Sequence, residues 1–184
     1  MPLVERPGLD LWAVWNQGHP IVIPTNIGWK HDGSAVMGRG LARAAASMFP
    51  RLPKLYGEAC QRYANGEAES ACVYYADARL YLAPSKPLNR TEPHLSWRGQ
   101  ATLATIHSSL QAIKEAVDTE KVAGLAMPLL GTGNGGLSIQ SVYNLTVTEL
   151  ADTVGVVLLA TPLSAEDMTD PEPGQWESGT QWTG

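Results

Sequence analysis

The chain has 184 residues, of which 44% are hydrophobic; this is enough to bury one good core, and the length does not require a second folded domain. Its formal net charge is −5, from 13 basic and 18 acidic residues. That balance argues against a wide basic surface that neutralises many phosphates along a nucleic acid, so any nucleic-acid substrate must be held locally.

The two cysteines, Cys60 and Cys72, fit neither a metal-ligand spacing nor a disulfide framework. The first thirty residues contain no charged segment followed by the apolar stretch of a signal peptide. No run approaches the ~18 apolar residues of a membrane span. We therefore expect a cytoplasmic protein with no membrane partner and no metal.

Short apolar runs alternate with helical patterns along the chain. Strands are predicted over 11–15, 21–25, 72–76, 80–83, 124–130 and 154–161, and helices over 38–48, 53–64, 99–117 and 139–151. This order predicts an α/β fold with a mainly parallel sheet covered by helices on both faces. The ligand crevice of such a fold lies at the carboxyl ends of its strands.

The composition changes near residue 165. From there to residue 184 the chain has five acidic residues, four Pro and Gly residues between positions 171 and 179, and no Lys or Arg. We predict one folded domain over residues 1–164 and a solvated acidic C-terminal tail over 165–184.

Two glycine-rich turns follow predicted strands and lead toward helices, one over Val36–Ala42 and the other over Met127–Leu137. The second has four glycines in the six residues 131–136. Glycine permits positive φ and lets successive N–H groups turn inward, so such loops can wrap a phosphate without a lysine. A pair of cradles suits a diphosphate or nucleotide, although glycine turns also end strands for purely structural reasons.

Asn26 and Lys86 each stand at the end of a predicted strand. An asparagine amide there can donate to and accept from the hydroxyls of a ribose, although asparagine also simply forms turns. A lysine with apolar neighbours can have a lowered pKa and attack a masked aldehyde such as an anomeric carbon, although most lysines are simply solvated.

Several other polar or aromatic residues lie in nearby loops. Arg98 can reach a phosphate or a base edge and Trp97 can stack on a ring; alternatively they cover the sheet and pair with a carboxylate. His31, Asp32 and His94 are candidates for moving protons, or bystanders. No Ser-His-Asp order, carboxylate pair or metal-binding cluster is evident.

Four blocks occur in an order that resembles the macro domain family, which binds ADP-ribose. They are Pro24-Thr-Asn26, Val36-Met-Gly-Arg-Gly-Leu-Ala42, Ala83-Pro-Ser-Lys86 with Trp97-Arg98, and Met127-Pro-Leu-Leu-Gly-Thr-Gly-Asn-Gly-Gly-Leu137. Within the family the chain is most similar to the DarG-like branch of DNA ADP-ribosyl glycohydrolase antitoxins and to the terminal ADP-ribose glycohydrolases. The likeness covers residues 21–161 and implies a three-layer α/β/α macro domain with a mixed, mostly parallel central sheet.

The resemblance assigns roles to these blocks. It implies that Asn26 orients the distal ribose and that Lys86 is the catalytic lysine. The implied ligand-binding residues are Thr25, Asn26, Val36, Met37, Gly38, Gly40, Trp97, Arg98, Leu130, Gly131, Thr132, Gly133, Asn134, Gly135 and Gly136.

The chain departs from the pattern at three places. Residues 27–35 separate the asparagine from the first glycine block, and residues 87–96 separate Lys86 from Trp97-Arg98. Gly135 stands where the terminal ADP-ribose glycohydrolases have an aspartate, which the antitoxin branch also lacks. Both inserts flank the place expected for the modified group.

The resemblance implies a hydrolase that removes ADP-ribose from a macromolecule, here taken to be a DNA base. ADP-ribose is then ligand or product, no separate cofactor is needed, and a cognate ADP-ribosyltransferase toxin is a candidate partner. The alternatives are an ADP-ribose-1″-phosphate phosphatase, which would use the same two loops, and a non-catalytic ADP-ribose reader. The retained lysine favours the glycohydrolase, whereas the acidic balance favours a small ligand over DNA.

Overall fold

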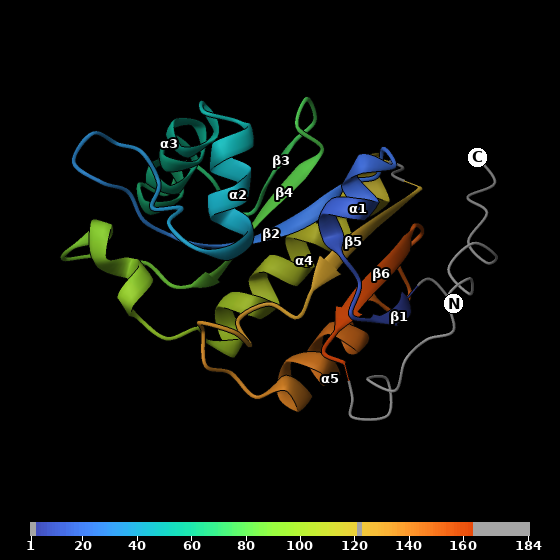
Figure 1. Cartoon of the computed structure of the whole chain (residues 1–184). Helices are drawn as coiled ribbons and strands as arrows, with labels where there is room; N and C mark the ends of the chain where they lie inside the picture. Colours follow the sequence, from blue (N-terminus) through green and yellow to red (C-terminus); the bar gives the residue numbers. More distant parts are fainter. Residues whose placement is uncertain (1–2, 121–122, 164–184) are drawn as a thin grey trace.

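A computed structural model describes residues 3–120 and 123–163, and the predicted acidic tail at 165–184 lies outside these ranges. Six strands form one sheet in the order β1-β6-β5-β2-β4-β3 (Figure 1). Their bounds are Leu3–Pro7 for β1, Ile21–Asn26 for β2, Val73–Tyr75 for β3, Leu80–Lys86 for β4, Gly124–Pro128 for β5 and Val156–Thr161 for β6.

The sheet is mixed and mostly parallel, as the sequence predicts. Every neighbouring pair is parallel except β3 and β4, which are antiparallel. The carboxyl ends of β2, β4 and β5 therefore meet at one edge of the sheet, and the loops that follow them share one space.

Helices cover both faces of the sheet, which makes three layers (Figure 1). Buried residues of α1 (Leu11–Asn16), α2 (Gly40–Met48) and α3 (Leu52–Ala64) pack on one face. Buried residues of α4 (Leu103–Glu120) and α5 (Ile139–Leu150) pack on the other. The strands alternate accordingly: Ile21 and Ile23 face the first group of helices, whereas Val22 faces the second.

The strand prediction over 11–15 is wrong, because this segment begins the short helix α1. The Asp10 side chain accepts hydrogen bonds from the N–H groups of Trp12 and Ala13, which caps the helix. Leu11 and Val14 then lie three positions apart on one buried face. The tryptophans of this run are typical of strands, but the Asp10 cap and the buried face stabilise a helix. The sequence analysis also missed the edge strand β1.

The region around Trp97 and Arg98 differs in detail from the prediction. Both residues end a short 3-10 helix, η1 (Pro93–Arg98), which begins with a proline at its first turn. The helix expected from residue 99 begins only at Leu103 as α4. Trp97 and Arg98 are therefore held by an element of their own.

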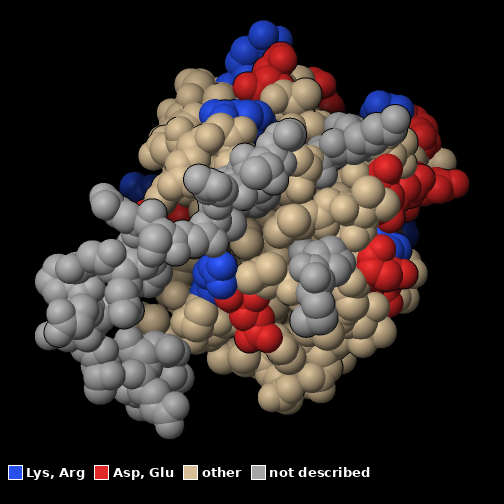
Figure 2. Space-filling view, turned by 90° about the vertical axis from the view of Figure 1, so that its right-hand side faces the viewer, with Lys and Arg blue, Asp and Glu red and all other residues tan. Residues whose placement is uncertain are grey.

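Within residues 3–120 and 123–163, no helix combines the length and hydropathy needed to cross a membrane. The same residues contain no group of three or more His, Cys, Asp or Glu that could hold a metal ion. Figure 2 shows the molecule from the side of β1 and β6, where Lys and Arg lie in small separate groups and Asp and Glu gather along one edge of the view. This face carries no broad basic surface.

Candidate functional site

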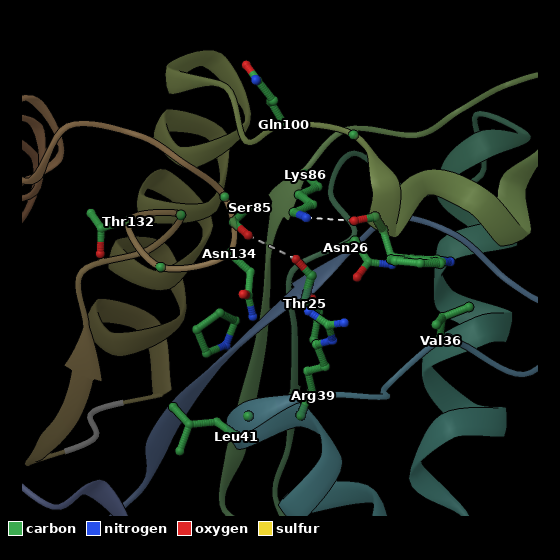
Figure 3. A pocket seen from close by; sticks show the side chains of 18 of the residues that line it. Thr25, Asn26, Val36, Arg39, Leu41, Ser85, Lys86, Gln100, Thr132 and Asn134 are labelled. Carbon is green, nitrogen blue, oxygen red and sulfur yellow. Dashed lines mark hydrogen bonds between the residues drawn. The ribbon is translucent and has the colours of Figure 1, made fainter.

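A cavity of about 930 Å³ lies at the carboxyl ends of β2, β4 and β5 (Figure 3). Its volume falls within the ~300–1,000 Å³ typical of small-molecule sites. Both glycine turns line it, together with the ends of β2 and β4 and the end of η1. The site thus forms where the α/β architecture predicts a ligand crevice.

Asn26 and Lys86 lie side by side in the sheet. They are register partners on the neighbouring parallel strands β2 and β4, and each is the last residue of its strand. The register shifts between Thr25 and Asn26, so Ser85 is the extra residue of a bulge in β4. A bulge changes the direction of the side chains that follow it, and here the next side chain is that of Lys86.

The Lys86 amine is held at the cavity by one short contact: its Nζ donates a hydrogen bond to the Trp97 carbonyl oxygen at 2.6 Å (Figure 3). Partial burial, and secondly the positive charge of Arg39, hold the Lys86 pKa below its ordinary value. Both effects disfavour the charged form, so a larger fraction of this amine is neutral near neutral pH than in an exposed lysine.

Asn26 has an amide donor that no described residue uses. Its amide nitrogen Nδ2 is buried and has no hydrogen-bond partner among the described residues, and the side chain lines the cavity. A buried polar atom without a partner costs free energy unless a ligand or water supplies one. The position therefore suits a hydroxyl oxygen of a bound sugar.

The floor of the cavity is fixed by hydrogen bonds between buried groups. Thr25 Oγ1 donates to Tyr56 Oη at 2.7 Å, which connects β2 to α3. Ser85 Oγ donates to the Thr25 carbonyl at 3.2 Å, which connects the β4 bulge to β2 (Figure 3). These bonds hold the backbone on which Asn26 and Lys86 stand, so the pair is preorganised.

The second glycine turn is packed against the start of α4. Gly131 has φ +75° and accepts a hydrogen bond from the Leu137 N–H at 3.0 Å, so the loop closes on itself. The Gly135 carbonyl accepts from the Ala101 N–H at 3.1 Å. A Cβ added at Gly135 would lie 2.4 Å from the Gly131 carbonyl oxygen. No side chain fits at Gly135 without a shift of the backbone.

The first glycine turn is open, and its last three residues, from Gly40 onward, form the start of α2. Gly38, Arg39 and Gly40 are exposed and line the cavity, and Arg39 stands at the N-cap position without a side-chain cap. The free N–H groups of the first turn of α2 and the Arg39 guanidinium are suited to an anion.

The charged residues that line the cavity are all cations: Arg39, Lys86 and Arg98. No Asp or Glu is among its described lining residues. The two thiols do not line it either, and burial raises the pKa of Cys60 to about 11 and of Cys72 to about 12. The site can attract a phosphate, and the Lys86 amine is its strongest candidate nucleophile.

Most of the predicted site residues lie together at this cavity. Those that line it are Thr25, Asn26, Val36, Gly38, Gly40, Lys86, Trp97, Arg98, Gly131, Thr132, Gly133, Asn134 and Gly135. Met37 and Leu130 are buried in the two cores instead, and Gly136 follows the loop outside the cavity lining. The side chains of Met37 and Leu130 are therefore not placed to contact a ligand in the cavity.

Sequence reasoning passed over three polar residues of the cavity, Arg39, Ser85 and Gln100. Arg39 and Ser85 stand inside motifs that were quoted for their neighbours, so the motif itself was the available signal. Gln100 lies in the turn between η1 and α4 and has no pattern around it. His31, Asp32 and His94 do not line the cavity; His31 and His94 line a separate hollow between the two inserts.

No family model matches the chain. The chain is 30% identical over 126 residues to the DNA ADP-ribosyl glycohydrolase of Mycobacterium tuberculosis (strain ATCC 25618 / H37Rv). The aligned segment covers 66% of this chain and 34% of that protein. The chain therefore spans about a third of the length of this curated relative.

Solved structures share the fold. The macrodomain of Thermus aquaticus DarG has a TM-score of 0.64 and 24% identity, over 87% of this chain and 99% of that one. The structure of Thermosipho africanus DarTG in complex with ADP-ribose has a TM-score of 0.57 and 26% identity, over 79% of this chain and 38% of that one.

Proposed function

The chain is a macro domain similar to those of the DarG proteins, and from that premise we propose that it is a hydrolase that removes ADP-ribose from a modified DNA base. The observation that carries the proposal is the pairing of Asn26 with Lys86 at the ends of β2 and β4, where both residues line the cavity. A reader of ADP-ribose needs the glycine loops, but it does not need an amine with a lowered pKa beside the sugar.

The two glycine loops supply the binding site in this proposal. The second loop offers backbone N–H groups to the diphosphate, and Arg39 at the start of α2 adds a positive charge. Asn26 Nδ2 gives the distal ribose the donor that lacks a partner in the described residues. The solved DarTG structure with ADP-ribose supports the choice of ligand.

Lys86 supplies the chemistry. When its amine is neutral, one N–H still donates to the Trp97 carbonyl, which leaves the lone pair free to attack. The amine bonds to the anomeric carbon of the distal ribose while the bond from that carbon to the base breaks. The amine nitrogen loses a proton and the departing base gains one. Water then adds its oxygen to the same carbon while the bond to lysine breaks; the lysine nitrogen takes up the proton that the water loses, which regenerates the amine and releases ADP-ribose.

The proposed partner follows from the reaction. An enzyme that removes ADP-ribose from DNA requires a transferase that attaches it, so we propose that the chain acts in the cytoplasm against a cognate ADP-ribosyltransferase toxin. Co-expression tests this: the wild-type chain should relieve growth inhibition by such a transferase, and the Lys86→Ala variant should not.

The first test is release of ADP-ribose from single-stranded DNA that carries ADP-ribosyl-thymidine. Lys86→Ala should lower kcat by ~10³-fold or more and leave the Kd for ADP-ribose within about threefold, because the glycine loops supply the affinity. Lys86→Arg keeps the positive charge but has no neutral amine, so it should be equally inactive if the lysine is the nucleophile. Loss of ADP-ribose binding together with activity would contradict this division of roles.

ADP-ribose-1″-phosphate is assayed in parallel. Release of phosphate without release from DNA would move the function to a phosphatase. A reader of ADP-ribose is the second candidate, because no carboxylate is present among the described lining residues to activate water. Binding of ADP-ribose with no turnover of either substrate would identify that function.

A further inference from the structure

A second hollow lies between the two inserts that separate this chain from the family pattern. It has a volume of about 340 Å³ and is lined by Trp29, Lys30, His31, Gly33, Gln61, Thr91, Pro93 and His94. We call it the insert groove. The first four residues come from the insert 27–35, Gln61 comes from α3, and the last three come from the insert 87–96.

The wall formed by residues 27–35 is fixed to α3. The Ala35 N–H donates to the Pro53 carbonyl at 2.7 Å, and Lys54 Nζ donates to the Asp32 carbonyl at 3.0 Å. A Cβ added at Gly57 of α3 would lie 2.0 Å from the Gly33 carbonyl oxygen, so the insert and the helix are in direct backbone contact. This wall is built into the fold.

The wall formed by residues 87–96 is fixed as well. Asn89 Oδ1 accepts hydrogen bonds from the N–H groups of Thr91 and Glu92, and the Asn89 N–H donates to Ser96 Oγ at 2.9 Å. A Cβ added at Gly28 would lie 2.2 Å from the Pro93 carbonyl oxygen, so the two inserts touch. The groove is therefore formed before any ligand arrives.

The chemistry of the insert groove is aromatic and basic. The rings of His31 and His94 lie with their centroids 5.0 Å apart, Trp29 adds a third ring, and Lys30 adds a positive charge. Asp32 and Glu92 are nearby but do not line the groove, and the Asp32 carboxylate accepts hydrogen bonds from the Ser34 N–H and hydroxyl. Flat rings with a cation suit a nucleobase and its phosphate.

One short element connects the groove to the main cavity. Pro93 and His94 at the start of η1 line the groove, whereas Trp97 and Arg98 at its end line the cavity that holds Lys86. Six residues of 3-10 helix rise ~12 Å, which is the length of about three to four stacked nucleotides at ~3.4 Å each. A short single strand can therefore reach both hollows.

We propose that the insert groove binds a nucleobase about three to four nucleotides along the strand from the modified base, so that the substrate is single-stranded DNA and not an isolated modified nucleotide. The inference rests on the proposed function and names the class of its substrate. The proposal also agrees with the charge balance. Five of the 18 acidic residues lie in 165–184, so residues 1–164 carry equal numbers of basic and acidic residues. A DNA strand would then be held at a local site instead of along a basic face.

The experiment compares kcat/KM for two substrates, an ADP-ribosylated single-stranded oligonucleotide and the ADP-ribosylated thymidine monophosphate. The wild-type chain should prefer the oligonucleotide by about tenfold or more, because a stacked base adds binding energy. The double variant His31→Ala/His94→Ala should lose this preference and keep the wild-type rate on the mononucleotide. His107→Ala is the matched control, since His107 lies on α4 and pairs with Glu149 away from the groove.

Three results would overturn the proposal: equal wild-type rates on both substrates, an unchanged preference in the double variant, or an equal fall on both substrates. If the wild-type chain hydrolyses neither substrate, the proposed function fails by itself. Fluorescence anisotropy with an unmodified thymidine oligonucleotide then decides on the groove. Weaker binding by the double variant than by the wild type and His107→Ala supports it, and equal binding overturns it.

Discussion

The two glycine turns line the same cavity, but the structure uses their glycines for different reasons. In the first turn, an added Cβ at Gly38 or Gly40 would meet nothing within 4 Å. In the second turn, an added Cβ at Gly131 would lie 2.9 Å from Ala101 Cβ, and one at Gly135 would meet the Gly131 carbonyl at 2.4 Å. The first turn is open at both glycines, whereas the second is packed at Gly131 and Gly135 and open at Gly133 and Gly136.

This difference separates two roles that look alike in the sequence. The packed positions Gly131 and Gly135 need glycine for folding whether or not a ligand binds, because neighbouring atoms occupy the space of a side chain. The open turn needs glycine only for the conformation of its backbone at Gly40, which has φ +54°, and for close approach of a ligand. Glycine density alone therefore does not identify which loop positions contact the ligand.

The largest effect expected from this comparison is on Gly135→Ala. The new methyl group would push against the Gly131 carbonyl and the Ala101 side chain, so the loop must move. We expect a loss of ~3 kcal/mol in the free energy of unfolding, equivalent to a fall in Tm of roughly 6–12 °C, and weakened ADP-ribose binding. Thermal unfolding followed by circular dichroism measures the first effect.

Gly133→Ala is the matched control in the same loop. An added Cβ there meets nothing within 4 Å, and Gly133 lines the cavity. Its Tm should stay within ~2 °C of wild type, while the Kd for ADP-ribose rises if the loop wraps the diphosphate. If Gly133→Ala unfolds as readily as Gly135→Ala, the distinction between packed and open positions is wrong.

Much of the fold follows from local sequence patterns. The strands β2 to β6 and the helices α2 to α5 were predicted because each has a pattern of apolar residues and turn residues at its ends. The strand prediction over 11–15 rested on a short apolar run with two tryptophans and did not consider the capping Asp10 that precedes it. The edge strand β1 has only five residues with two charges, so its pattern is too weak to predict a strand.

The site could be predicted where a recognisable motif marks its residues. Asn26 and Lys86 were found in this way, but their register pairing depends on the order of strands in the sheet, which no local pattern encodes. Arg39 was not predicted because its charge lowers the pKa of Lys86 through space, and the two residues are far apart in the sequence. The insert groove is formed by two inserts about sixty positions apart that touch each other at Gly28 and Pro93, a contact that only the folded chain shows.

The next effect concerns the open turn. Gly40→Ala would place an alanine at φ +54°, in the left-handed region, with no steric clash around it. We expect a loss of ~1 kcal/mol, or about 2–4 °C in Tm, which is smaller than that of Gly135→Ala because only the backbone conformation is strained. Thermal unfolding of both variants side by side tests the order.

Gly38→Ala is the control for this position, since Gly38 has open space and is not among the glycines with positive φ. It should leave Tm unchanged within ~2 °C. If Gly40→Ala were as stable as Gly38→Ala, the turn would tolerate a side chain at both positions, and the sequence preference for glycine there would come from the ligand alone.

The smallest effect on stability is expected from Arg39→Ala, because the Arg39 side chain is exposed. Its free energy of unfolding should change by less than ~0.5 kcal/mol. The substitution should also change how kcat depends on pH. Arg39 lowers the pKa of Lys86, so its removal should raise that pKa, and the rising limb of the pH–kcat profile should move to higher pH.

At neutral pH the Arg39→Ala variant should then be slower, and it should recover toward the wild-type rate as the pH rises. Arg39→Lys keeps the positive charge and should keep the wild-type profile, which separates charge from shape. A profile that falls by the same factor at every pH would mean that Arg39 only binds substrate. The open turn would then supply affinity alone, and the lowered pKa of Lys86 would depend on its partial burial, the larger of the two causes.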